Sequence, residues 1–198
     1  DKILSKLNIK YLMVGDDFKF GKERSGDFDF LSDWGSNNQI EVDRIPTHSF
    51  EGRRVSSTWI RESIADGNFD LAAKLLDRRY TFSGKVVFGN KIGRTIGVPT
   101  ANIWVPKSNL PIRGVYAVKA LVKGETFNGI ANMGVRPTVG GTSPVLEIHI
   151  FDFNEEIYGC RIEVEFYQKI RNEKKFENLD KLKEQINLDI AKTRKYFS

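Results

Sequence analysis

The 198-residue chain is long enough for one large domain or two small ones, and 40% hydrophobic with 29% charged residues is the composition of an ordinary globular protein. No apolar run reaches the roughly 18 residues that a membrane helix needs, and the single cysteine, Cys160, excludes an internal disulfide and favours a reducing compartment. The net charge of +5 suits an anionic ligand, such as nucleotide phosphates or a nucleic acid, but an ordinary basic surface explains it about as well.

The N-terminus, DKILSKLNIKYL, has neither the basic region nor the small-residue cleavage site of a signal peptide. We therefore expect a cytoplasmic protein without membrane contacts. Because the chain does not begin with Met, we also expect it to be a processed product or a fragment of a longer protein.

The first part of the chain has α/β character. A short helix over 1–7 is expected to lead into a strand at Tyr11–Val14, followed by Asp16 and Asp17, and acidic residues at the carboxyl end of a strand are typical of ligand sites in α/β sheets. The later pattern predicts a polar, Gly-rich loop over 20–35, a strand over 39–45, a helix behind the N-cap candidates at 56–58 and a second helix over 70–76. Two strands are too few for a complete doubly wound domain, so its front part is expected to be missing.

From Tyr80 the chain changes to short runs rich in Val, Ile, Phe and Tyr, separated by Gly, Pro and Asn. This pattern predicts six strands of an antiparallel barrel, over 80–88, 101–105, 114–122, 126–133, 145–151 and 162–170. A last helix has an apolar stripe that should pack on the barrel, formed by Leu179, Leu182, Ile186, Ile190, Thr193 and Phe197. The predicted domains are therefore 1–77, incomplete and α/β, and 78–198, mainly β.

The stretch GNKIGRTIGVPTAN, over 89–102, has the composition of a phosphate-binding loop. Glycines let backbone N–H groups approach an anion closely, and Lys91 and Arg94 add positive charge. It matches neither the Walker motif nor GxGxxG. The alternative is a mobile hairpin loop. The glycines concerned are Gly89, Gly93 and Gly97.

Thr100 and Asn102 end this stretch and are two residues apart, so on a strand they face the same side. A hydroxyl and an amide oxygen are hard ligands of the kind that Mg²⁺ prefers, usually together with phosphates and water. The pair therefore predicts a site for a magnesium-bound nucleotide.

In VLEIHIFDF, Glu147 and His149 share one strand face while Leu146, Ile148 and Ile150 share the other, which should face the core. Glu147 is a candidate base for phosphoryl transfer to a hydroxyl. The alternative is a solvated carboxylate on an outer strand face, and His149 has the same alternative; nothing near it has metal-ligand spacing.

Taken together, GNKIGRTIGVPTAN, GVYAV, GIANMGVRPTVGG, LEIHIFDFNEEIYG and IRNEKKFENLDKLKEQI resemble the riboflavin kinase module, over essentially all of the chain from Tyr80 onward. VGDDFKFGKERSGDF and VSSTWIRESIADGNFDLAAKLLDRRY resemble the later part of the FMN adenylyltransferase module of prokaryotic bifunctional riboflavin kinase/FAD synthetases. The resemblance implies a six-stranded Greek-key barrel with a C-terminal helix, and ATP-dependent phosphorylation of riboflavin to FMN with release of ADP.

The resemblance also implies roles for residues. The Gly-rich segment would cover the ATP phosphates, Thr100 and Asn102 would hold Mg²⁺, and Glu147 would activate the 5′-hydroxyl of the ribityl chain. The flavin ring would lie between the barrel, its loops and the last helix, with Arg171 and Glu173 as polar contacts. The segment bordering the nucleotide would contain Asp152, Phe153 and Tyr158.

The front part matches the family's SSTxIR nucleotide motif through Ser56, Ser57, Thr58 and Arg61. The adenylyltransferase signature Gly-x-Phe-Asp-Gly-x-His-x-Gly-His does not occur in the sequence, so these 198 residues are expected to make FMN but not FAD, whereas the full-length protein would make both.

Two other functions remain as alternatives. A small basic barrel could bind single-stranded nucleic acid with exposed aromatic residues, but the 14 Phe residues mostly alternate inward or lie in turns, so we expect no nucleic-acid partner. A flavin carrier without catalysis is disfavoured because Glu147 and the PTAN segment occur together. The oligomeric state is open.

Overall fold

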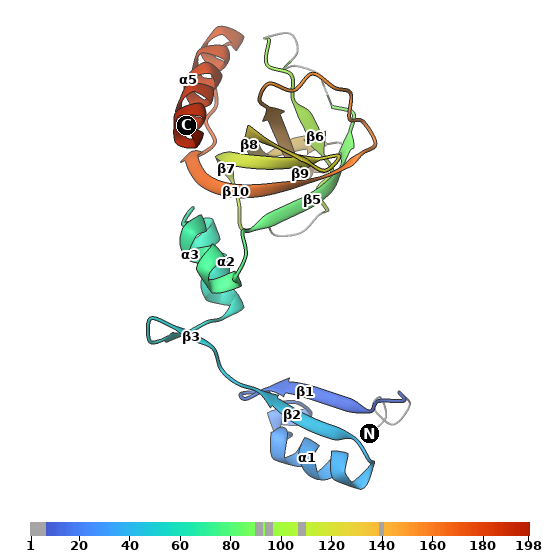
Figure 1. The fold of residues 1–198 in the computed structure, drawn as a ribbon. Coiled ribbons are helices and arrows are strands. Elements are labelled where there is room, and N and C mark those ends of the chain that lie inside the picture. Colours follow the sequence, from blue (N-terminus) through green and yellow to red (C-terminus); the bar gives the residue numbers. More distant parts are fainter. Residues whose placement is uncertain (1–6, 90–92, 94–96, 107–109, 139–140) are drawn as a thin grey trace. The chain divides into compact units, whose positions relative to one another are not determined.

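A computed structural model describes residues 7–89, 93, 97–106, 110–138 and 141–198, in two compact units, Asp1–Val55 and Ser56–Ser198 (Figure 1). The helix expected over 1–7 lies outside the described residues except for its last position. No helix in the described part of the chain is long and apolar enough to cross a membrane. The domain boundary expected after Asp77 stays a prediction.

The first unit is a βαβ arrangement. Strands β1 (Tyr11–Gly15) and β2 (Glu41–Ile45) pair in parallel, and helix α1 (Phe28–Asn37) connects them. A 3₁₀ turn (Lys22–Arg24) precedes α1. A short hairpin of β3 (Ser49–Phe50) and β4 (Arg53–Arg54) follows β2. Arg54 binds Asp17 at 2.8 Å, and this ion pair holds the pKa of the Asp17 carboxyl below its usual value.

The expected loop over 20–35 is wrong in its second half, because α1 begins at Phe28. Asp27 caps the helix by accepting a hydrogen bond from Phe30 N at 3.1 Å. Gly35, which suggested a loop, serves helix packing: a Cβ there would lie 2.7 Å from Ile40 O, so only glycine lets α1 approach the segment before β2 this closely.

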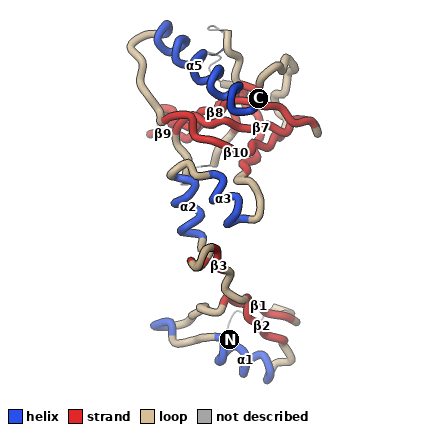
Figure 2. Tube along the Cα trace, turned by 60° about the vertical axis from the view of Figure 1, so that its left-hand side comes forward, coloured by secondary structure: helices blue, strands red, loops and turns tan. Residues whose placement is uncertain are grey.

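The second unit begins with two helices, α2 (Ser57–Ala65) and α3 (Phe69–Leu76), which lie side by side (Figure 2). Ser56 and Asn68 cap them, and Asp77 ends α3 with a left-handed φ of 54°. Phe69 of α3 is buried against barrel aromatics, with its ring 5.6 Å from Tyr116 and 5.8 Å from Phe166. This contact joins the helices to the barrel in one compact unit.

Six antiparallel strands close the barrel, as the sequence predicted: β5 (Thr81–Val87), β6 (Ala101–Ile103), β7 (Gly114–Val122), β8 (Glu125–Thr138), β9 (Gly141–Ile150) and β10 (Arg161–Arg171). The structure adds their order, which is β10-β5-β6-β9-β8-β7. Strands β7 to β9 form a meander, and β6 returns beside β9, which is a Greek-key connection.

Helix α5 (Leu179–Phe197) is attached to the barrel at several points. Ile190 and Phe197 pack on a small buried cluster that includes Val115 and Ile170. Arg171, at the end of β10, donates through Nε to Asp189 Oδ2 at 2.8 Å, and Gln185 donates to the other oxygen of Asp189 at 2.9 Å. The Asp189 side chain is only 5% exposed, so this ion pair is largely shielded from water.

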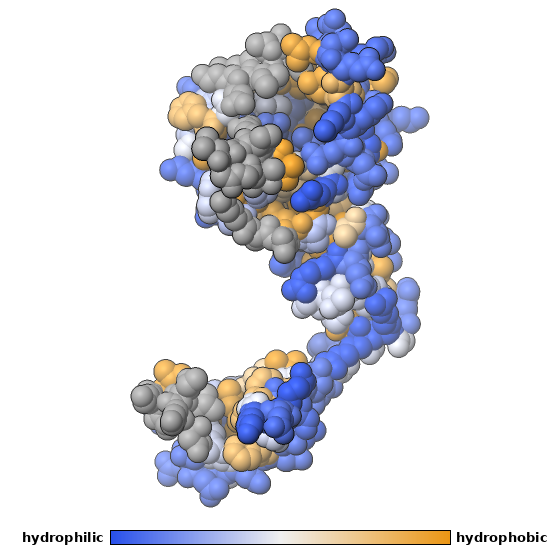
Figure 3. Space-filling model, turned by 180° about the vertical axis from the view of Figure 1, so that it is seen from behind, coloured by the Kyte–Doolittle hydropathy of each residue, from blue (hydrophilic) through white to orange (hydrophobic). Residues whose placement is uncertain are grey.

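Hydrophilic residues dominate the visible face of the barrel unit, and its apolar residues form separate small areas (Figure 3). Scattered apolar residues of this kind are normal for a protein surface.

Asp189→Asn should lower the free energy of unfolding by about 1–3 kcal/mol, because Arg171 loses its charged partner in a nearly buried place. Chemical denaturation followed by circular dichroism measures this change. Glu184→Gln is the matched control on the same helix, since it removes an ion pair with Lys181 whose side chains are both 63% exposed, and it should stay close to wild type. Equal effects of the two substitutions would contradict the structural role of Asp189.

Tyr116→Phe should change how stability depends on pH. Tyr116 is buried and donates to Arg113 O at 2.6 Å, and burial raises its pKa to about 12. The unfolded phenol ionises near 10, so stability is fully present below pH 10 and is lost as pH rises toward 12, by roughly 2–3 kcal/mol.

Denaturation midpoints at several pH values between 9 and 11.5 measure this slope. The Phe variant should be less stable at pH 7 but lose less between pH 10 and 11.5, whereas exposed Tyr196→Phe should follow the wild type. An unchanged slope in Tyr116→Phe would show that Tyr116 does not carry the effect.

Candidate active site

Three polar residues lie in one row across neighbouring barrel strands. Asn102 of β6 pairs with Glu147 of β9, and Glu147 pairs on its other side with Asn132 of β8. Residues directly opposite each other in a sheet face the same side, with Cβ atoms about 5 Å apart. The Glu147 carboxylate therefore lies between two amide side chains, on the strand face opposite the buried Leu146 and Ile148.

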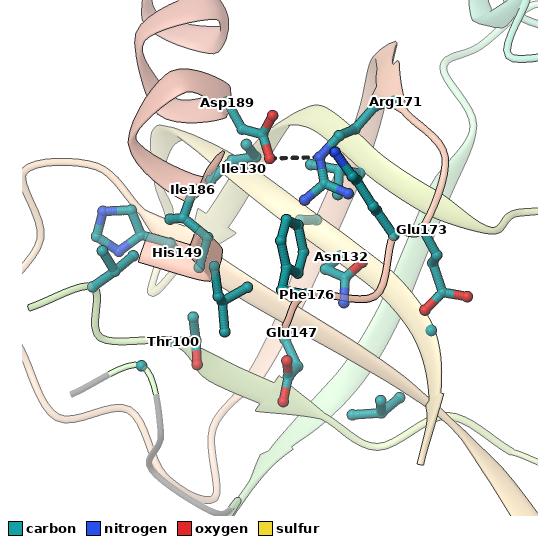
Figure 4. Close-up of a pocket in the computed structure, with 18 of the residues that line it drawn as sticks. Thr100, Ile130, Asn132, Glu147, His149, Arg171, Glu173, Phe176, Ile186 and Asp189 are labelled. Atoms are coloured by element: carbon teal, nitrogen blue, oxygen red, sulfur yellow. Dashed lines mark hydrogen bonds and ion pairs between the residues drawn. The ribbon is translucent and has the colours of Figure 1, made fainter. Parts of the chain in front are cut away.

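This row opens onto a cavity of about 450 Å³, within the range of small-molecule sites (Figure 4). Glu147 and Thr100 lie at one end of it, and Arg171 and Asp189 at the other. Its walls come from the barrel, the segment after β10, and α5. Its lining includes apolar Ile130, Phe176, Leu182 and Ile186, and polar Thr100, Asn102, Asn132, Glu147, His149, Arg171 and Glu173.

Thr100 immediately precedes β6 and borders two cavities. It lines the large cavity together with Asn102, as their spacing predicted, and it also lines a smaller one of about 90 Å³. The smaller cavity includes Phe153 and Tyr158. An ion or phosphate bound at Thr100 could therefore contact molecules in both cavities.

The side chains expected at the nucleotide have different positions. Tyr158 stacks on Phe88, with ring centroids 4.1 Å apart. Asp152 lies outside both cavities, and Arg194 of α5 binds its two carboxylate oxygens at 2.9 and 2.8 Å. This hydrogen-bonded ion pair lowers the pKa of Asp152, although the side chain is 77% exposed. Asp152 thus secures the turn after β9 to α5.

The two residues expected to contact a flavin do line the large cavity. Arg171 is oriented by Asp189, and its guanidinium carbon lies 5.7 Å from the centre of the Phe176 ring. Glu173 lies against β8 at Gly134, where any Cβ would collide with the Glu173 carboxylate. Glycine at 134 therefore makes room for this acid at the cavity wall.

The Gly-rich segment approaches the same place. A Cβ on Gly89 would collide with the Asn102 amide, and a Cβ on Gly93 would lie 3.2 Å from Thr100 Oγ1. Gly97 has a φ of 80°, a left-handed conformation that favours glycine. Lys91 and Arg94, expected to supply charge, lie outside the described residues.

The SSTxIR residues begin α2. The Ser56 hydroxyl accepts a hydrogen bond from Trp59 N at 3.2 Å and so caps the helix. Ser57, Thr58 and Arg61 are exposed on its first turns. None of the four lines the large cavity.

The described residues contain no group of three or more His, Cys, Asp or Glu side chains able to hold a metal ion. The oxygens of Thr100 and Asn102 fit Mg²⁺ as partial ligands only, because this ion commonly completes its shell with phosphate and water. The donor set therefore fits a metal that arrives with a nucleotide.

Sequence reasoning missed Asn132, Phe176 and Asp189 as cavity residues. Leu182 and Ile186 belong to the stripe that was expected to pack on the barrel, and the sequence did not indicate that they also line the cavity. The available signal for Asp189 was its position directly beside the apolar stripe of the last helix, next to Ile190.

Known proteins resemble the chain along its whole length. The family described as "Riboflavin kinase" matches residues 76–197, and the one described as "FAD synthetase" matches residues 1–59. A structure described as a macrolide-efflux protein from Streptococcus pneumoniae is 36% identical, with a TM-score of 0.75, over 92% of this chain and 60% of its own.

Two curated relatives bear the name "Bifunctional riboflavin kinase/FMN adenylyltransferase". The Haemophilus influenzae protein is 47% identical over 99% of this chain, and the Escherichia coli K12 protein is 43% identical over 100% of it. The chain spans 64% and 63% of their respective lengths. Because the first family match covers more than half of the sequence, the chain belongs to the riboflavin kinase family.

Proposed function

We propose that this chain transfers the terminal phosphoryl group of ATP to the 5′-hydroxyl of riboflavin, giving FMN and ADP. The observation that carries the proposal is the position of Thr100 and Glu147: Thr100 borders both cavities, and Glu147 lies in the large one. This arrangement allows the phosphate donor and the hydroxyl that receives the phosphoryl group to meet at one point. Glu147 lies beside them and can accept the proton of that hydroxyl.

Riboflavin occupies the large cavity. Its flat ring suits the apolar walls at Ile130, Phe176 and Ile186, while Arg171 and Glu173 offer polar contacts for the ring edge. The ribityl chain then extends toward Asn132 and Glu147. ATP approaches on the side of Thr100 and Tyr158, where the small cavity holds only part of it.

Glu147 accepts the proton of the 5′-hydroxyl while the hydroxyl oxygen forms a bond to the γ-phosphorus of ATP. The bond between this phosphorus and the oxygen that bridges to the β-phosphate breaks, and ADP leaves. Asn102 and Asn132 flank Glu147 on the two neighbouring strands. Mg²⁺, bound through Thr100, Asn102 and the phosphates, would neutralise phosphate charge. Positioning and charge neutralisation, without a covalent intermediate, account for catalysis.

The relatives are longer than this chain, and their name states a second activity, that of an FMN adenylyltransferase. For a protein of their full length we propose this activity, the adenylylation of FMN to FAD. Ser56, Ser57, Thr58 and Arg61 would contribute to that nucleotide site.

Incubation with riboflavin, ATP and Mg²⁺ tests the proposed function when FMN and ADP are measured together by chromatography. Equal amounts of the two products support it. Riboflavin binding without either product would favour a carrier, and ADP release without FMN would indicate an ATPase.

Glu147→Gln should lower kcat by roughly 10²–10⁴, because the amide keeps the shape of the side chain but cannot accept the proton. Riboflavin affinity, measured by fluorescence quenching, should change little. Glu163→Gln, an exposed glutamate on β10, is the matched control and should keep full activity. Retained turnover in Glu147→Gln, or a loss explained by a lower melting temperature, would exclude Glu147 as the base.

Thr100→Ala and Asn102→Ala should each raise the KM for MgATP and the Kd for MgADP more than the Kd for riboflavin, because each substitution removes one oxygen from the phosphate side of the site. Titration calorimetry with ADP at several Mg²⁺ concentrations provides a readout independent of turnover. Thr126→Ala, at an exposed position of β8, serves as control. Parallel losses of riboflavin and MgADP affinity would contradict the assignment.

A further inference from the structure

We propose that His149 is a positioning residue: it holds the backbone at Pro99 and thereby places Thr100 for the nucleotide. The inference rests on the proposed kinase function and adds a residue to it. Its basis is one contact between distant parts of the chain, from His149 Nδ1 to Pro99 O at 2.8 Å.

The direction of this hydrogen bond follows from its chemistry. A carbonyl oxygen only accepts, so Nδ1 must carry the hydrogen and donate it. The neutral ring therefore exists as the Nδ1–H tautomer. The ring also contacts Phe151 in a T-shaped arrangement, with centroids 5.6 Å apart, which restricts its rotation.

The bond lies where the regular sheet pairing stops. The ladder between β6 and β9 begins at the pair Ala101 and Ile148, so Thr100 is the last residue before it. Proline has no N–H and cannot donate to a ladder. The His149 side chain thus continues the connection between the two segments one step beyond the last backbone pair.

A second contact fixes the segment from the other direction, because Val98 N donates to Gly93 O at 2.8 Å. Thr100 is therefore preceded by two residues whose backbone groups are both held. His149 is two residues from Glu147 on the same strand face, so the bond ties the phosphate side of the site to the strand that carries the proposed base.

This geometry makes a prediction that a structural role does not make. Without this bond Thr100 no longer stays in contact with the charged nucleotide, and a contact with a charged group contributes roughly 10- to 100-fold to affinity. His149→Ala should therefore raise the KM for MgATP by about that factor. Riboflavin affinity should stay within about twofold. Loss of folded protein alone would lower kcat and leave the KM of the remaining enzyme unchanged.

Two near-isosteric variants test the donor. In His149→Asn, the amide nitrogen is as many bonds from Cβ as Nδ1 is, so it can still donate to Pro99 O, whereas in His149→Gln the nitrogen lies one bond farther out. The Asn variant should keep the KM for MgATP within about threefold of the wild-type value, and the Gln variant should not. His48→Ala, in the first unit, is the matched control at the other histidine.

The experiment combines kinetics with MgADP titration calorimetry and ¹⁵N spectra of the histidine rings. Support requires an Nδ1–H signal that disappears in His149→Asn, together with weaker MgADP binding in the Ala and Gln variants. An Nε2–H tautomer, or Ala, Asn and Gln variants with the same KM for MgATP, would overturn the inference. If wild type forms FMN and the variants do not differ, only this inference fails; if wild type forms no FMN, the proposed function fails.

Discussion

The antiparallel register of β6, β9 and β8 is the constraint on which the candidate site depends. It sets Asn102, Glu147 and Asn132 in one row, and it does so through backbone hydrogen bonds rather than flexible side chains. A shift by one residue would turn Glu147 toward the core and expose Leu146 or Ile148, which are fully buried. Core packing and site geometry therefore stabilise the same register.

The other wall of the cavity is attached differently. Helix α5 uses Ile190 and Phe197 for apolar packing, while Arg171 and Asp189 link it to the end of β10. Arg194 and Asp152 link it to the turn after β9. The largely buried pair at the cavity therefore holds the helix that carries Leu182 and Ile186, whereas the exposed Arg194–Asp152 pair contributes little.

Much of the barrel could be predicted because its strands alternate strongly and are separated by Gly, Pro and Asn. Helix α1 could not, since its ten residues include Gly35 and two serines and only Leu31 and Gly35 are buried. Thr100, Asn102 and Glu147 could be singled out by their spacing and by family resemblance. Phe176 and Ile186 could not be distinguished from core residues, because the sequence does not reveal which part of an apolar stripe faces a cavity.

The central claim is that riboflavin lies in the large cavity with its 5′-hydroxyl at Glu147. A crystal structure of the complex with riboflavin and ADP tests it most directly. The account predicts the ring against Phe176 and Ile186 and the 5′-hydroxyl oxygen about 2.6–3.2 Å from a Glu147 oxygen. A ring bound beside Tyr158, or a ribityl chain directed away from Glu147, would contradict it.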